Sequence, residues 1–168
     1  MLFSALTTQR AVAITREHGN PGAAGVMLGL WATGSLLAGL AYGAIAWRVP
    51  ARRRFVAAVA AFAAGTVLIT ATTESLFALT VALFVAGLAN APTLISGNTL
   101  VPAAVVPTAV TEAYTWLTVS VFAGIAVGAP IAGALIDHAG GQAALHASIA
   151  AGAATALIAL LGYRTLPA

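Results

Sequence analysis

Long apolar stretches separated by short polar turns make up most of this 168-residue chain, and one turn holds four of its seven basic residues. These are Arg48, Arg52, Arg53 and Arg54. A helix of about 20 mainly apolar residues can cross the hydrocarbon core of a bilayer, and arginine-rich loops between such helices stay on the cytoplasmic side. The pattern therefore predicts a polytopic membrane protein and places this loop in the cytoplasm.

The composition supports the same class of protein. Hydrophobic residues make up 61% of the chain and charged residues 7%, whereas a soluble domain carries roughly 25% charged residues. The formal charge of +3 is concentrated beside apolar segments and forms no stripe of the kind that binds nucleic acid. We therefore expect a lipid bilayer as the surroundings of the chain and no nucleic-acid partner.

Residues 1–168 are expected to form one all-α transmembrane bundle of six segments. Five segments are long enough to cross a bilayer, but the first is short and contains Gln9 and Arg10. We favour a partial crossing for it, and an amphipathic helix lying in the membrane interface is the alternative. The stretch from Pro102 to Val110 holds two prolines and is expected to be a loop. The approximate spans are 1–15 (partial), 23–47, 55–70, 76–95, 113–136 and 143–163.

Six crossings also fix an orientation for the chain. With the arginine loop in the cytoplasm, the turns at Glu74 and Asp137 lie outside and the tail at Arg164 lies inside. The only arginine left in an outside segment is Arg16, next to Glu17, so the excess of positive charge faces inward. We therefore predict a multi-pass protein of the bacterial cytoplasmic membrane, with the arginine loop and the C-terminus in the cytoplasm.

Residues for chemical catalysis are not assembled anywhere in the sequence. The chain has no cysteine, which excludes disulfides and thiolate chemistry. Its three histidines are too scattered for a metal site, and no nucleophile, base and acid occur in a recognisable arrangement. We expect no enzyme activity, no metal and no cofactor.

A glycine-proline motif in the span 113–136 carries the most specific signal. Residues 124–133 read GIAVGAPIAG, with Pro130 inside a predicted membrane helix, where neighbouring helices can compensate for the lost backbone donor. The pattern resembles the glycine-proline motif of major facilitator superfamily transporters. By this resemblance, Gly124, Gly128, Pro130 and Gly133 form a helix-bend and packing motif.

Other stretches are similar to the second half of the same superfamily. Residues 43–48 read GAIAWR and precede Arg52 and Arg53, as in the basic loop between the second and third helices of each transporter half. Trp47 stands where that motif has an acidic residue, so a charge-relay role is not carried over. Residues 111–116 and 133–137 resemble bacterial drug- or sugar-efflux members.

The resemblance covers the whole chain, but only as a C-terminal six-helix half whose first helix is truncated. It implies transport of a small molecule by alternating access, probably directed outward as in efflux, with an N-terminal half or a second copy needed to close the pathway. A truncated, non-transporting membrane protein with a structural or partner-modulating role is the alternative. A membrane-embedded enzyme ranks last.

Polar residues inside membrane spans are the candidate pathway residues, because such residues are costly there and often functional. Gln9 and Arg10 lie in the first segment, while Asn90 and Thr93 lie in the span 76–95. Arg10 either faces a central cavity or reaches outward along its helix. Asn90 either bonds between helices or contacts substrate. Thr118 and Ser120 are expected to bond their own helix backbone, and Thr111 with Glu112 to cap a helix.

Overall fold

The computed structural model describes residues 22–72 and 75–164. Over these residues the chain is helical and contains no strand, so the prediction of an all-α bundle is confirmed. The elements in chain order are α2 (Gly22–Ala44), α3 (Ala51–Ala71), α4 (Leu76–Ala104), the short 3-10 helix η1 (Pro107–Ala109), α5 (Val110–Leu161) and the 3-10 helix η2 (Gly162–Arg164).

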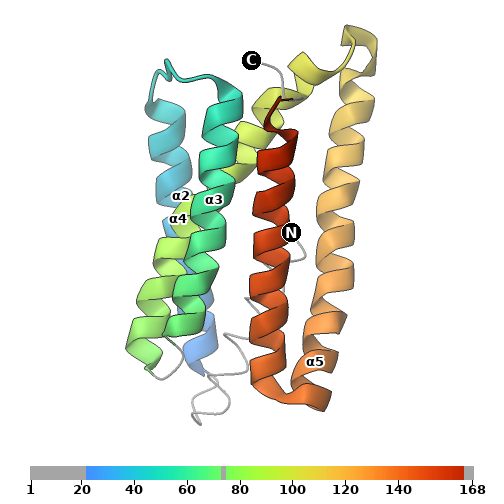
Figure 1. Ribbon diagram of the computed structural model, residues 1–168. Coiled ribbons are helices and arrows are strands. Elements are labelled where there is room, and N and C mark those ends of the chain that lie inside the picture. The colour runs from blue at the N-terminus through green and yellow to red at the C-terminus, as the bar shows by residue number, and fades with distance from the viewer. Residues whose placement is uncertain (1–21, 73–74, 165–168) are drawn as a thin grey trace.

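Helix α4 is the centre of the bundle. It packs along both α2 and α3, whereas α5 packs mainly against α3. Figure 1 shows α2, α3 and α4 grouped together, with α5 beside them. The ribbon of α5 folds back on itself in its orange stretch, so that α5 forms two antiparallel arms and its C-terminal end returns to the end of the bundle where α3 begins.

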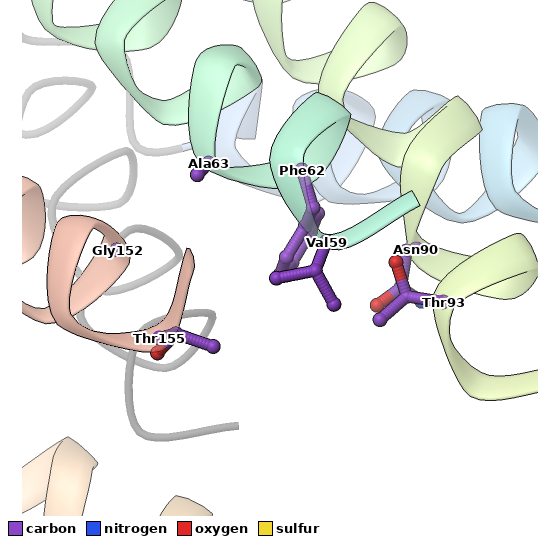
Figure 2. Close-up of a pocket in the computed structure, with 7 residues that line it drawn as sticks. All are labelled: Val59, Phe62, Ala63, Asn90, Thr93, Gly152 and Thr155. Carbon is purple, nitrogen blue, oxygen red and sulfur yellow. The ribbon is translucent and has the colours of Figure 1, made fainter. Parts of the chain in front are cut away.

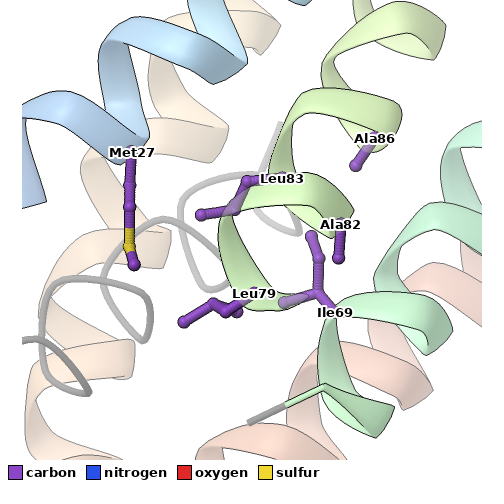
Figure 3. Packing of buried hydrophobic residues seen from close by; sticks show 6 residues of the cluster. All are labelled: Met27, Ile69, Leu79, Ala82, Leu83 and Ala86. Carbon is purple, nitrogen blue, oxygen red and sulfur yellow. The ribbon is translucent and has the colours of Figure 1, made fainter. Parts of the chain in front are cut away.

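The buried core lies where α2, α3 and α4 meet (Figure 3). Leu79, Ala82, Leu83 and Ala86 of α4 stand on one side of it. They recur at intervals of three and four residues, which places them on one face of a helix. Met27 from α2 and Ile69 from α3 complete the cluster, and Trp31 packs against it.

Two glycines allow α2 and α4 to approach backbone to backbone. A Cβ atom added to Gly87 would overlap the carbonyl oxygen of Trp31 in α2, and one added to Gly34 would lie 2.5 Å from the carbonyl oxygen of Phe84 in α4. The contact is reciprocal, since each helix offers a glycine to the backbone of the other. In lipid no hydrophobic effect drives helices together, so close packing of this kind holds them.

Helix α4 continues past the expected end at residue 95 to Ala104. The expectation was wrong because Ser96, Asn98 and Thr99 were taken as a polar turn. Each of them instead donates to a backbone carbonyl one helical turn back, on Pro92, Leu94 and Ile95 respectively, at 2.5, 2.8 and 2.7 Å. Side chains satisfied in this way can remain inside an apolar helix.

Pro102 also lies inside α4, so the expected loop from Pro102 to Val110 is shorter than predicted. Pro102 has no N–H and leaves the carbonyl of Asn98, four residues earlier, without its helical donor. The hydroxyl of Tyr114 in α5 donates to that carbonyl at 3.2 Å. A neighbouring helix thereby restores the bond that the proline removed.

Three other expected boundaries differ from the observed ones. Helix α3 begins at Ala51, so Arg52, Arg53 and Arg54 lie in its first turn and not in the loop. Helix α2 ends at Ala44, before the expected residue 47. The expected spans 113–136 and 143–163 both fall within α5, Val110–Leu161.

The predicted cap at Thr111 and Glu112 is also displaced. The N-cap of α5 is Ala109, and no side chain bonds the helix end there. Glu112 stands in the first turn and accepts a hydrogen bond from Trp116 Nε1 at 3.4 Å. Thr118 and Ser120 donate to the carbonyls of Tyr114 and Trp116 at 2.8 and 2.7 Å, which confirms the prediction that they bond their own helix.

Three helical segments of the described chain are long and apolar enough to cross a membrane: Ala23–Ala44, Leu76–Ala104 and Pro107–Leu135. A shorter apolar segment covers Ile149–Leu161. Large apolar side chains are also widely exposed, for example Phe77 at 79% and Ile158 at 70%. Such surfaces are a liability in water and the normal outer face of a protein in lipid.

Candidate substrate pathway

A polar-lined cavity lies between α3, α4 and the returning arm of α5 (Figure 2). Its volume is about 70 Å³, enough for water molecules but below the roughly 300 Å³ of a typical ligand pocket. Asn90 and Thr93 stand side by side on α4 and face Thr155 of α5 across the opening. The remaining lining residues are Val59, Phe62, Ala63 and Gly152.

Asn90 joins two helices as well as lining the cavity. Its side-chain Nδ2 donates to the hydroxyl oxygen of Ser35 in α2 at 3.1 Å. Interhelical bonds of this kind are typically worth about 0.6 kcal/mol in a membrane bundle. The carbonyl oxygen of the same amide is a separate acceptor. Asn90 therefore combines the two roles that its position in the sequence left open, an interhelical bond and a place on a cavity wall.

Thr93 lies between this cavity and a second one. The second has a volume of about 200 Å³ and is bounded by α3, α4 and the first arm of α5. Thr93 Oγ1 donates to the carbonyl of Ala89 at 2.7 Å, so its hydroxyl proton is held by the helix and its oxygen can still accept. The second cavity is lined by Phe55, Thr93, Leu94, Gly97, Asn98, Leu117, Thr118 and Val121.

Sequence reasoning missed Ser35 and Thr155 and assigned Thr118 only to its own helix. All three are small polar residues within apolar segments, which is the signal that selected Asn90 and Thr93. Many hydroxyls of this chain bond only their own helix, as Thr80 and Thr99 do. Only the packing of α4 against its neighbours separates the residues that line a cavity from those that do not.

The other predicted site residues fall into three groups. Gln9 and Arg10 lie outside the described residues, and their place on the pathway stays a prediction. Pro130 lies inside α5, as the glycine-proline motif requires, and Gly128 is buried. The role of Gly124, Gly128, Pro130 and Gly133 as a bend stays a prediction too. The arginines form the third group and are more ordered than a simple topology signal.

Arg54 is held between two aromatic rings at the junction of α2 and α3. Its guanidinium carbon lies 5.5 Å from the ring centre of Tyr42 and 5.4 Å from that of Trp47, within cation–π range. Arg54 Nη1 donates to the Tyr42 hydroxyl at 2.9 Å, and Nε donates to the carbonyl of Val49 at 3.1 Å. Trp47 Nε1 donates to the carbonyl of Tyr42 at 2.8 Å and fixes its own ring.

Arg52 and Arg53 reach the C-terminal end of the described chain. Arg52 lies over the ring of Tyr163 at 5.1 Å, and Arg53 Nε donates to the Tyr163 hydroxyl at 3.3 Å. Tyr163 is in η2, beyond the apolar arm of α5. The hydrogen bond from Arg53 lowers the pKa of the Tyr163 hydroxyl below its usual range, with a smaller contribution from the positive charge of Arg52. The three arginines thus connect the end of α2 to the end of α5.

These features define a class of protein: a polytopic helical membrane protein with small polar cavities between its helices. Within the described residues, no cluster of histidine, aspartate and glutamate side chains could hold a metal ion. Comparison with family models matches the Major Facilitator Superfamily over residues 1–168. The chain belongs to that superfamily, a family of membrane transporters of small molecules. Comparisons with curated proteins and with solved structures each returned no match.

Proposed function

We propose that this chain is the C-terminal six-helix half of a secondary transporter that exports a small molecule across the bacterial cytoplasmic membrane by alternating access. The family match over the whole chain carries the proposal. In this superfamily two six-helix halves move against each other around a site near the bilayer midplane. An N-terminal half or a second copy of this chain supplies the opposing wall.

The pathway in this half follows the polar face of α4. Asn90 and Thr93 line cavities that the first arm and the returning arm of α5 close from two sides. Their small volumes suit a wall of the pathway, and the larger space for a substrate lies against the opposing half. Gln9 and Arg10 of the first segment complete this side, where Arg10 offers a charge for a polar or anionic group.

Transport is tested by purifying the chain from its membrane in mild detergent, so that a bound partner is retained, and measuring efflux of a panel of drugs and sugars from proteoliposomes. We expect Thr93→Val to reduce flux of the transported compound about ten-fold, as expected when roughly 1.4 kcal/mol of stabilisation is lost. Asn90→Leu is expected to reduce it further, because it also breaks the bond to Ser35.

Thr80→Val is the matched control. Thr80 is on the same helix and makes the same kind of bond to its own backbone, at 2.7 Å to Leu76, but lines neither of the two cavities. Equal losses for Thr80→Val and Thr93→Val would remove Thr93 from the pathway. A panel in which no compound moves with the intact preparation would contradict the transport function itself.

The proposed orientation places the arginine loop and the C-terminus in the cytoplasm. The contact between Arg53 and Tyr163 supports the view that both lie on one side of the bundle. The chain has no cysteine, so a single Arg48→Cys or Asp137→Cys substitution gives a unique label site. We expect a membrane-impermeant thiol reagent added to intact cells to label Asp137→Cys and not Arg48→Cys. The reverse labelling pattern would show that the orientation is inverted.

A further inference from the structure

An apolar groove with a cationic rim lies where α2 gives way to α3. Its volume is about 450 Å³, the largest of the three cavities described here. We call it the arginine groove. It is lined by Tyr42, Trp47, Val49, Arg53, Arg54, Ala57, Ala58 and Pro92. Two of these residues carry charge, and the others present mainly carbon to the interior.

The positive charge at this groove has no counterpart in the described protein. The first turn of α3 contains three arginines and no acidic residue, although the exposed N–H groups of a helix N-terminus already favour an anion. Glu112 and Asp137 are the carboxylates among the described residues, and neither forms an ion pair there. Arg52 Nε is buried without a hydrogen-bond acceptor. An anion at this end of α3 would therefore be stabilised.

The two arginines at the rim are held in place and retain donors. A guanidinium has five N–H groups. Arg54 uses Nε and Nη1 for Val49 and Tyr42, and Arg53 uses Nε for Tyr163. The remaining N–H groups are free to form paired bonds with phosphate oxygens, which match the planar fork of arginine. Because the aromatic contacts already fix Arg54, little further ordering is needed when a phosphate binds.

We propose that the arginine groove binds one phospholipid with a net negative headgroup. Its phosphate lies against Arg53 and Arg54, and one acyl chain follows the apolar wall of Ala57 and Ala58 toward Pro92. A soluble anion would satisfy the charge but leave the apolar wall uncovered. A zwitterionic lipid would cover the wall but bring no net charge. Basic pockets between membrane helices are known to select anionic lipids on these grounds. This binding is independent of the transported substrate.

Trp47 provides a direct probe, since it lines the groove and is 39% exposed. In a Trp31→Phe, Trp116→Phe background it is the one remaining tryptophan of the three in the chain. The full chain is placed in phosphatidylcholine nanodiscs, with a small fraction of lipid brominated in its acyl chains to quench fluorescence. We expect brominated phosphatidylglycerol to reach half-maximal quenching at a mole fraction about ten-fold lower than brominated phosphatidylcholine does.

Variants separate the groove from the general charge of the loop. Arg53→Gln and Arg54→Gln are each expected to reduce the preference roughly five-fold, the contribution of about one basic residue at a membrane surface. Ala57→Leu narrows the apolar wall without changing charge and is expected to reduce it as well. Arg48→Gln, from the same loop but outside the groove, is the matched control and should retain the preference. Circular dichroism in phosphatidylcholine confirms that each variant is folded.

Three outcomes would overturn the proposal. Equal quenching by the two brominated lipids would show that headgroup charge is not read at Trp47. A loss in Arg48→Gln as large as that in Arg54→Gln would assign the preference to diffuse loop charge. Quenching absent for both lipids would show that protein, and not lipid, covers the groove. None of these outcomes depends on whether the chain transports.

Discussion

Gly87→Ala is expected to destabilise the bundle by about 3 kcal/mol, at the upper end of the usual cost of overpacking. The added Cβ would overlap the backbone carbonyl of Trp31. Backbone cannot move aside as a flexible side chain can, so α2 must separate from α4. Separation also draws the Phe84 carbonyl away from Gly34 and lengthens the bond from Asn90 to Ser35.

The effect is measured as the free energy of unfolding in mixed micelles, with circular dichroism as the readout. Gly43→Ala is the control, because Gly43 is an exposed residue of α2 and no described heavy atom lies within 4 Å of the position of its added Cβ. Alanine has the higher helix propensity, by up to about 1 kcal/mol, so this variant should be as stable as the parent or slightly more. If Gly87→Ala unfolds like Gly43→Ala, the close contact of α2 and α4 is wrong.

Leu79→Ala has the second largest expected effect, about 2 kcal/mol of destabilisation. Leu79 is 0% exposed and lies in the core shared by α2, α3 and α4 (Figure 3). In lipid the hydrophobic transfer energy of a leucine is small, because the unfolded helix contacts lipid instead of water. The lost contacts around the cavity left behind remain, and they place the value at the lower end of the range for leucine truncation.

Leu88→Ala is the matched control on the same helix. Leu88 is 37% exposed, so truncation there opens no enclosed cavity, and we expect a change below about 0.5 kcal/mol. The same mixed-micelle titration serves for both variants. Similar losses at Leu79 and Leu88 would mean that the α4 face carrying Leu79 is not the buried one.

Much of the fold follows from apolar segment length and arginine placement. The membrane class, the all-α architecture and the family are confirmed, because each depends on local features: runs of apolar residues, polar turns and a ten-residue motif. Helix ends were less predictable. Ser96, Asn98 and Thr99 have the composition of a turn, yet their bonds to their own helix keep them inside α4.

The candidate pathway was predictable in part. Asn90 and Thr93 were selected because polar groups inside a membrane span are costly, and both line a cavity. Thr155 and Ser35 carry the same kind of signal, but a hydroxyl that bonds its own helix has the same sequence as one that faces a cavity. Which of the two applies depends on what packs against the helix, and that is a property of several segments far apart in the chain.

The sequence by itself determined that this chain lives in a bilayer, that its helices are long and apolar, and which superfamily it belongs to, because these are set by local composition and short motifs. Tertiary structure alone decided that Gly34 and Gly87 bring α2 against α4, and that Tyr114 satisfies the carbonyl freed by Pro102. It also decided that Arg52, Arg53 and Arg54 form a cluster with aromatic residues at the ends of α2 and α5. The physical reason is that interhelical contacts depend on the rotation and crossing of helices, which packing between distant segments fixes.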